Sequence, residues 1–305
     1  MGAPPVNQGQ VHLKGVPFDA SRLLSWQSCL RIFSLLCGFL AMSSEAQAEA
    51  SVNHAPWHQL LQTYVVPAPN GHNTRVDYAG FLSERAKLTA YLQSLATVKK
   101  AEFARLSPAA QLAFLINAYN AWTVELILTA YPKLNSIKDL GSIFRSPWRR
   151  AFIPLLEETR SLDDIEHRLI RGEAGYREPR IHFAVNCASI GCPALRAEAY
   201  DEMRLESQLE DQTLDFLRDR SRNRLVENRL EVSPIFNWYR DDFEKDGSHF
   251  KRLEDFFIHY REALDLTAEQ IQMLQLGTLR ITFTDYDWRL NQNPQPSIQA
   301  RDASW

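Results

Sequence analysis

The stretch PAAQLAFLINAYNAWTVELIL, residues 108–128, decides the fold. It begins at a Ser107-Pro108 pair, which is typical of a helix start because serine caps the first turn and proline is accommodated at its first position. The helical pattern runs on to Tyr131, where Pro132 ends it. Apolar residues lie on nearly every face of the segment. A helix of this kind is buried, so the sequence predicts a central helix that the rest of the chain surrounds.

Shorter segments of helical pattern and four or five short strands flank this helix, and no linker divides them. We therefore expect an α+β fold, a mostly helical single domain with a small mixed β-sheet, over residues 49–290. Residues 291–305 read NQNPQPSIQARDASW, which is the composition of a disordered tail.

The N-terminal region has the pattern of an export signal. Residues 30–41 read LRIFSLLCGFLA, an apolar run that follows Arg22, and Ala46 and Ala48 form the small-x-small pattern of a cleavage site. The run is shorter than the roughly 20 residues that a membrane span needs. The sequence thus predicts that residues 1–48 are an extension plus a signal peptide cleaved after Ala48. The mature protein would be periplasmic or secreted, without stable membrane insertion.

Composition narrows the classes of partner. The chain has 305 residues, a formal net charge of −3 and 45% hydrophobic residues. This balance is ordinary for a globular protein and gives no basis for binding nucleic acid. The sequence predicts no cofactor. A small-molecule or peptide-like substrate remains the expected partner.

The densest reactive chemistry is RIHFAVNCASIGCPALR, residues 180–196. Residues 181–186 are apolar and β-favouring, which predicts a central strand. On such a strand His182 would share a face with Asn186 and point away from Cys187. Gly191 permits a tight or left-handed turn, which would expose Cys192 and surround it with backbone N–H groups.

Three interpretations of the two cysteines stay open. In the first, Cys192 is a nucleophile for hydrolysis or acyl transfer, with His182 or His167 as base and Asn186 or backbone amides as oxyanion donors. In the second, a Cys187–Cys192 disulfide staples a non-catalytic binding domain, as an oxidising compartment favours. The third is a metal site that uses both thiols and a histidine, but no second ligand pair stands out, so no metal is predicted.

Two further groups of polar residues are candidates. Asp163 and His167 are four residues apart in SLDDIEH, so on a helix they share a face, and the carboxylate can orient the imidazole. Asn117 and Asn120 interrupt the apolar central helix. Buried amides need partners, so these two either hold a loop packed over the helix or bind substrate.

Several segments together resemble the uncharacterised family known as domain of unknown function 547, over about residues 105–262. The resemblance rests on LAFLINAYNAWTVELIL (112–128), SIKDLG (136–141), SLDDIEHRLIR (161–171), PRIHFAVNCASIGCPALRAEAY (179–200) and FNWYRDDF (236–243). It implies an exported bacterial protein, or a module of the kind found in plant proteins. It also implies that the paired asparagines, the SLDDIEH helix and the two cysteines gather at one site, but it identifies no reaction.

Overall fold

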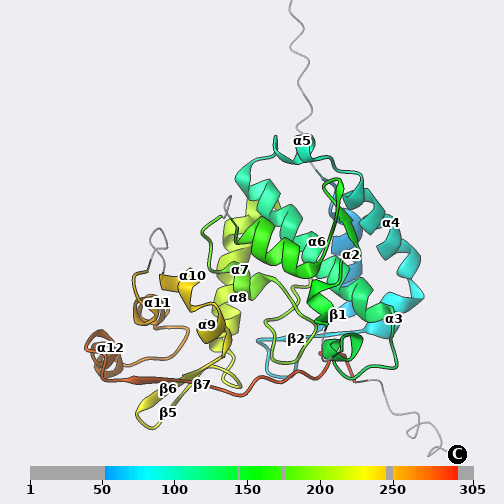
Figure 1. The fold of residues 1–305 in the computed structure, drawn as a ribbon. Coiled ribbons are helices and arrows are strands. Elements are labelled where there is room, and N and C mark those ends of the chain that lie inside the picture. The colour runs from blue at the N-terminus through cyan, green and yellow to red at the C-terminus, as the bar shows by residue number, and fades with distance from the viewer. Residues whose placement is uncertain (1–51, 143–144, 173–175, 245–249, 295–305) are drawn as a thin grey trace, which may run out of the picture. The chain divides into compact units, whose positions relative to one another are not determined.

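The computed structural model describes residues 52–142, 145–172, 176–244 and 250–294, which belong to one compact unit (Figure 1). Its longest helix is α6 (Pro108–Leu128). The hydroxyl of Ser107 accepts the N–H of Ala110 at 3.1 Å and so caps the first turn. Most of the α6 side chains are buried, including Asn117 and Asn120. The predicted central buried helix is confirmed.

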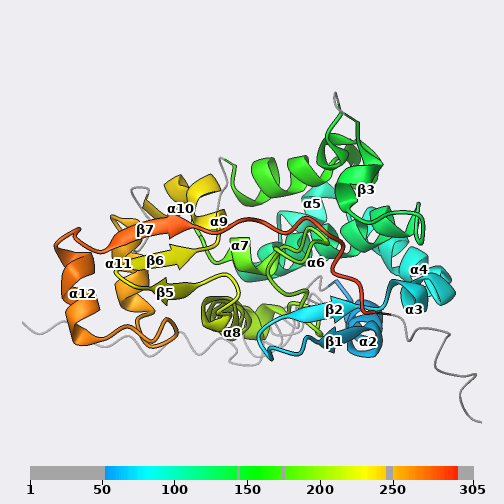
Figure 2. The ribbon, with the colours of Figure 1, turned by 90° about the horizontal axis from the view of Figure 1, so that it is seen from below.

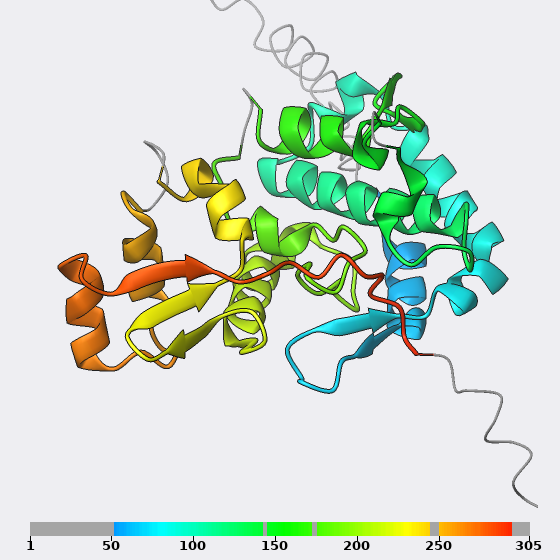
Figure 3. The ribbon, with the colours of Figure 1, turned by 60° about the horizontal axis from the view of Figure 1, so that its bottom comes forward.

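A layer of helices and two short hairpins packs around α6 (Figure 3). These elements are α2 (Ala55–Tyr64), β1 (Val65–Pro67), β2 (Thr74–Val76), α3 (Tyr78–Ser83), α4 (Arg85–Ala96), α5 (Lys100–Phe103), the 3-10 turns η1 (Ile137–Leu140) and η2 (Pro147–Arg149), β3 (Ile153–Leu155), β4 (Glu158–Arg160) and the π-helical turn η3 (Asp164–Ile170). Leu88, Leu115 and Ile165 are among the side chains that α4, α6 and η3 contribute to the first hydrophobic cluster, which these elements share.

The second half of the chain forms a small mixed sheet with helices beside it (Figure 2). Strand β6 pairs antiparallel with β5 and parallel with β7. The elements are α7 (Ile181–Ala184), η4 (Glu202–Arg204), α8 (Leu205–Arg218), β5 (Arg224–Val226), β6 (Arg229–Val232), α9 (Ile235–Trp238), α10 (Arg240–Glu244), α11 (Leu253–His259), α12 (Ala268–Gln275) and β7 (Arg280–Phe283). The mostly helical α+β class and the mixed sheet are as predicted.

The core consists of two clusters. The first cluster surrounds α6 and is mainly aliphatic. The second cluster lies between the sheet and α8–α12 and is rich in phenylalanine, with Phe183, Phe216, Phe236, Phe243 and Phe256 in mutual ring contact. The short helix α7 contributes to both clusters, so the segment that leads to the cysteines is fixed from two sides.

The strand predicted over residues 181–186 is wrong. Residues Ile181–Ala184 form the helical turn α7, and only at Val185 does the chain become extended. A helical turn sends successive side chains about 100° apart. Ile181 therefore enters the first cluster, Phe183 enters the second, and His182 lies between them. A strand offers only two faces and cannot serve three surroundings.

After β7 the chain runs back beside the cysteine loop to β2 (Figure 2). The N–H groups of Ile190 and Gly191 donate to the carbonyls of Arg289 and Asp287, each at 2.8 Å. Asn291 is buried and accepts the hydroxyl of Tyr78 at 2.7 Å. The chain therefore stays packed into the first residues of the predicted tail. The rest of that tail from residue 295, and the predicted signal segment 1–48, lie outside the described residues.

Within the described residues, the search for a helix that is long and apolar enough to cross a membrane finds none.

Candidate functional site

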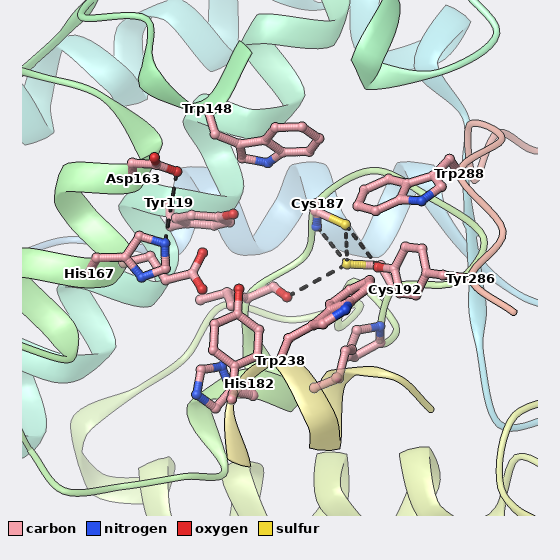
Figure 4. A pocket seen from close by; sticks show the side chains of 15 residues that line it. Tyr119, Trp148, Asp163, His167, His182, Cys187, Cys192, Trp238, Tyr286 and Trp288 are labelled. Atoms are coloured by element: carbon pink, nitrogen blue, oxygen red, sulfur yellow. Dashed lines mark hydrogen bonds and ion pairs between the residues drawn. The ribbon is translucent and has the colours of Figure 1, made fainter. Parts of the chain in front are cut away.

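One pocket of about 180 Å³ brings together the cysteines, both candidate histidines and Asp163 (Figure 4). Its walls are mostly aromatic, and they come from both halves of the fold. The lining residues are Tyr119, Trp148, Asp163, Glu166, His167, His182, Val185, Cys187, Cys192, Pro193, Ile235, Trp238, Tyr239, Tyr286 and Trp288. The family resemblance seen in the sequence spans about residues 105–262, so Tyr286 and Trp288 lie beyond it toward the C-terminus.

The cysteine loop turns sharply after Cys187. Ala188 has φ of +63°, in the left-handed region that is sparsely populated for residues other than glycine. This conformation directs the N–H of Ser189 to the Cys187 sulfur. Gly191, predicted to permit a tight or left-handed turn, is not in the left-handed region, and its lack of a side chain matters instead. A Cβ there would lie 2.9 Å from the Tyr286 ring, so only glycine lets that ring approach the loop.

The two sulfurs lie 2.7 Å apart, and both cysteines are free. The backbone N–H of Cys187 donates to the Cys192 sulfur at 2.8 Å. The Cys187 sulfur in turn lies 3.2 Å from the hydroxyl oxygens of both Ser189 and Tyr286. The closure of the loop therefore places one thiol inside a group of hydrogen-bond donors.

These surroundings shift the pKa values of the two thiols in opposite directions. Burial raises the pKa of Cys187, but hydrogen bonds from Cys192, Ser189 and Tyr286 outweigh it and lower that pKa to about 7. The pKa of Cys192 is raised well above its usual range by burial and by the neighbouring Cys187. Cys192 is also only 4% exposed. Cys187, rather than the Cys192 chosen from sequence, is the thiol that ionises near neutral pH.

His182 is fixed away from the sulfurs. Its Nε2 lies 2.7 Å from Asp242 Oδ2, and its ring stacks on Tyr239 with centroids 3.9 Å apart. Burial lowers the pKa of His182, against the raising effect of Asp242. Asp242 also accepts Arg171 Nε at 2.5 Å, and these partners hold its pKa far below the usual range despite its burial. His182 therefore works as an ordered neutral ring beneath Tyr239.

His167 is the more accessible imidazole. It projects from η3 with 40% of its side chain exposed, and Nε2 lies 3.9 Å from Asp163 Oδ1. Its Nδ1 lies 2.6 Å from Arg171 Nη1. Ser161 and Asp164 cap the start of this turn with reciprocal hydrogen bonds. Between the described residues no hydrogen bond links either sulfur to an imidazole, so His167 faces the cysteines across the pocket (Figure 4).

Residues 103–217 match the family described as "Protein of unknown function, DUF547". The chain carries a DUF547 segment. This confirms the resemblance drawn from the sequence. No curated protein and no solved structure matches the chain.

The DUF547 segment contains α6, η3 and both cysteines, but only part of the pocket wall. Trp238 and Tyr239 from the α9 region, and Tyr286 and Trp288 after β7, lie beyond it. The second half of the chain therefore completes the site that the DUF547 segment begins.

The asparagines of the DUF547 segment hold the loop rather than line the pocket. Asn117 exchanges two hydrogen bonds with the backbone of Tyr200, at 2.8 and 2.9 Å. Asn120 donates to the Ala184 carbonyl at 3.0 Å and accepts the Asn186 N–H at 2.8 Å. Asn186 donates to Pro193 O and accepts the N–H of Ala188. All three amides bind backbone N–H and C=O groups of residues 184–200 that the neighbouring segment 287–291 does not pair.

Sequence reasoning missed the arginine that holds the other side of the loop. Buried Arg222 donates to the carbonyls of Ile190, Gly191 and Cys192 at 2.6–3.1 Å. Its Nε lies 2.8 Å from Asp219, which is 1% exposed. The segment DRSRN gave no periodic or motif signal that separates Arg222 from the surface arginines beside it.

The described residues contain no group of three or more His, Cys, Asp or Glu side chains placed to hold a metal ion.

Proposed function

We propose that the protein is a thiol enzyme in which Cys187 is the nucleophile for hydrolysis or acyl transfer at an ester, amide or peptide-like bond. One observation carries the proposal. The N–H and hydroxyl of Ser189, the hydroxyl of Tyr286 and the thiol of Cys192 all converge on the Cys187 sulfur, whose pKa falls to about 7. A thiolate at neutral pH, inside a pocket, is the reactive form of cysteine.

In this mechanism the sulfur needs no base of its own. The thiolate attacks the carbonyl carbon, and the C=O electron pair moves to oxygen. The hydroxyl of Tyr286 stays protonated, because burial and the nearby thiols raise its pKa well above the usual range, so it can donate to that oxygen. Asn186 is unsuited to this role because its amide is committed within the loop.

His167 and Asp163 would act on the opposite side of the substrate. His167, when protonated, gives its proton to the leaving group as the tetrahedral intermediate collapses to a thioester. In the next step Arg171 releases Nδ1, which keeps the ring proton, and Nε2 accepts a proton from water, or from an acyl acceptor, as that molecule attacks the thioester. Asp163 orients the ring. Both residues line the pocket with Cys187, which supports this division of roles.

A nitrophenyl ester provides a direct test. The parent protein should release nitrophenol in a burst, with a thioester adduct at Cys187 visible by intact mass. Cys187→Ser should abolish the burst. Cys192→Ser should retain it with a slower rate, since it removes one of the donors to the thiolate. A burst of equal size in Cys187→Ser would exclude the proposal.

A second candidate is a non-catalytic binding domain with a Cys187–Cys192 disulfide staple. The 2.7 Å separation of the sulfurs favours it, because a small movement would bring them to the roughly 2.05 Å of a bond. Intact mass separates the candidates. A gain of two hydrogen atoms on reduction, with iodoacetamide labelling only afterwards, supports the staple. Labelling of Cys187 without a reductant supports the enzyme.

We also propose export, supported by the apolar run 30–41 and the residues Ala46 and Ala48. N-terminal sequencing of the protein from a secreted or periplasmic fraction should start at Glu49. An intact Met1 in the cytoplasmic fraction alone would contradict this.

A further inference from the structure

Glu166 is a buried carboxylate that makes no direct ion pair among the residues that the structure describes. It comes from η3, is 6% exposed and lines the pocket. Among the residues that the structure describes, no lysine, arginine or histidine nitrogen lies within 4 Å of its carboxylate oxygens. The guanidinium of Arg171 instead binds Asp242 and His167. Burying a charge is costly unless a partner compensates it. The hydroxyl of Tyr239 bonds to Glu166, and the charge of Arg171 acts on it from farther away. Within the described residues no cation binds its oxygens directly, so the carboxylate can accept a positive group from the pocket.

Aromatic rings form the other walls of the same space (Figure 4). Trp288 is in ring contact with Trp148 at 5.8 Å, Trp238 at 6.0 Å and Tyr286 at 4.5 Å between centroids. Trp238 is 48% exposed, so a large part of this apolar side chain is open to solvent. These four rings make a continuous aromatic surface beside Cys187.

The lining of the pocket carries carboxylates, one of which, Asp163, is paired with Arg149. Two carboxylates, Glu166 and Asp163, line it, and no lysine or arginine does. Rings of the same set already bind cations. Lys138 Nζ lies 3.6 Å from the centroid of Trp288, and Arg171 lies 4.8 Å from that of Tyr239. The negative face of an indole or phenol attracts a cation, most strongly where water is excluded.

We propose that the pocket binds an alkylammonium group of the substrate, between Glu166 and the tryptophan rings. The substrate class rests on the proposed function: the enzyme would cleave acyl esters or amides whose leaving part or acyl part carries an ammonium group. As a binding site, it depends only on Glu166 and the rings.

A matched pair of probes tests the binding site. Choline and 3,3-dimethylbutanol have the same shape, but the second has carbon in place of the charged nitrogen. Titration followed by tryptophan fluorescence and calorimetry should show roughly ten-fold tighter binding of choline. Glu166→Gln should remove this preference. Glu262→Gln, whose parent side chain is 91% exposed, is the control and should retain it. Equal binding of the two probes by the parent protein would overturn the inference.

Two further measurements keep the outcomes separate. Should Glu166→Gln fail to fold, Trp238→Ala replaces it, since its half-exposed ring can be removed without a core cavity. That variant should lose at least half of the choline preference, and an unchanged preference would overturn the inference.

Titration of Cys187→Ser should leave choline binding intact. Choline binding without any acyl-ester turnover by the parent would refute the enzyme alone. Turnover of neutral esters with no choline preference would refute the ammonium site alone.

Discussion

The two hydrophobic clusters hold the same loop by different means. On the side of the first cluster, α6 uses the neutral amides of Asn117 and Asn120. On the side of the second cluster, Arg222 binds three consecutive carbonyls, and Asp219 balances its charge. A buried ion pair depends on both partners, whereas a buried amide leaves only uncharged groups when it is removed. The comparison teaches that the geometry around Cys187 depends on polar contacts more than on packing.

The largest effect is expected on the arginine side. Arg222→Met should lower the free energy of unfolding by about 4 kcal/mol, because Asp219 stays buried without its cation and three carbonyls lose their donor. Urea unfolding measures this. Arg224→Met is the matched control on the adjacent strand, and its half-exposed ion pair with Glu231 should cost about 0.5 kcal/mol. Similar losses in both variants would contradict the structural role of Arg222.

The amide side should be slightly less sensitive. Asn120→Ala should cost about 3 kcal/mol, since the carbonyl of Ala184 and the N–H of Asn186 lose their partner in the interior. Exposed Asn237→Ala, the control, should change stability by less than about 0.5 kcal/mol. Iodoacetamide labelling of Cys187 should also slow in Asn120→Ala, because the loop donors lose their alignment. A stable variant with unchanged labelling would show that Asn120 is dispensable.

The same contrast explains what the sequence predicts. The α6 helix was predictable because its apolar character is local and continuous, and the buried asparagines stood out within it. Residues 181–186 were misassigned because a short apolar run has the same composition in a strand as in a helical turn that serves two cores. Only tertiary contacts distinguish the two structures.

The chemistry of the site was predictable in part. Cys187, Cys192, Asp163 and His167 do line one pocket, as their proximity in sequence or their shared resemblance indicated. The choice between the thiols depends on Tyr286, which is about 100 residues away in sequence and carries no motif. Contacts between such distant segments are set by the whole fold, so single-sequence patterns do not contain them.

Removing one donor from the reactive thiol sharpens the comparison between the two sulfurs. Alkylation of Cys187 should rise with pH through a midpoint near 7, because only the thiolate reacts. Tyr286→Phe should move that midpoint upward by about one unit, since a hydrogen bond to a charged group contributes about 1.5 kcal/mol. Thr282→Val, in strand β7 before Tyr286, is the control and should leave the midpoint in place. An unmoved midpoint in Tyr286→Phe would mean that the hydroxyl does not stabilise the thiolate.

The smallest effect concerns two histidines whose pKa values are lowered, half-buried His54 beside the first cluster and buried His182 beside the second. His54 contacts Tyr91 and Phe114 of the first cluster, and burial lowers its pKa to about 4. Burial also lowers the pKa of His182 in the second cluster. Below about pH 6.5 the unfolded chain binds protons that the folded chain does not, so stability is complete above that pH and falls as the pH is lowered.

For His54 the loss should reach about 0.8 kcal/mol at pH 6. Urea unfolding of the parent and of His54→Gln at pH 7.5 and pH 6 isolates this contribution as the difference between the two pH dependences. Gln62→Ala, an exposed and non-titrating position on the helix that begins after His54, serves as the control and should keep the parental dependence. If His54→Gln also keeps it, the first cluster holds its imidazole in a polar environment.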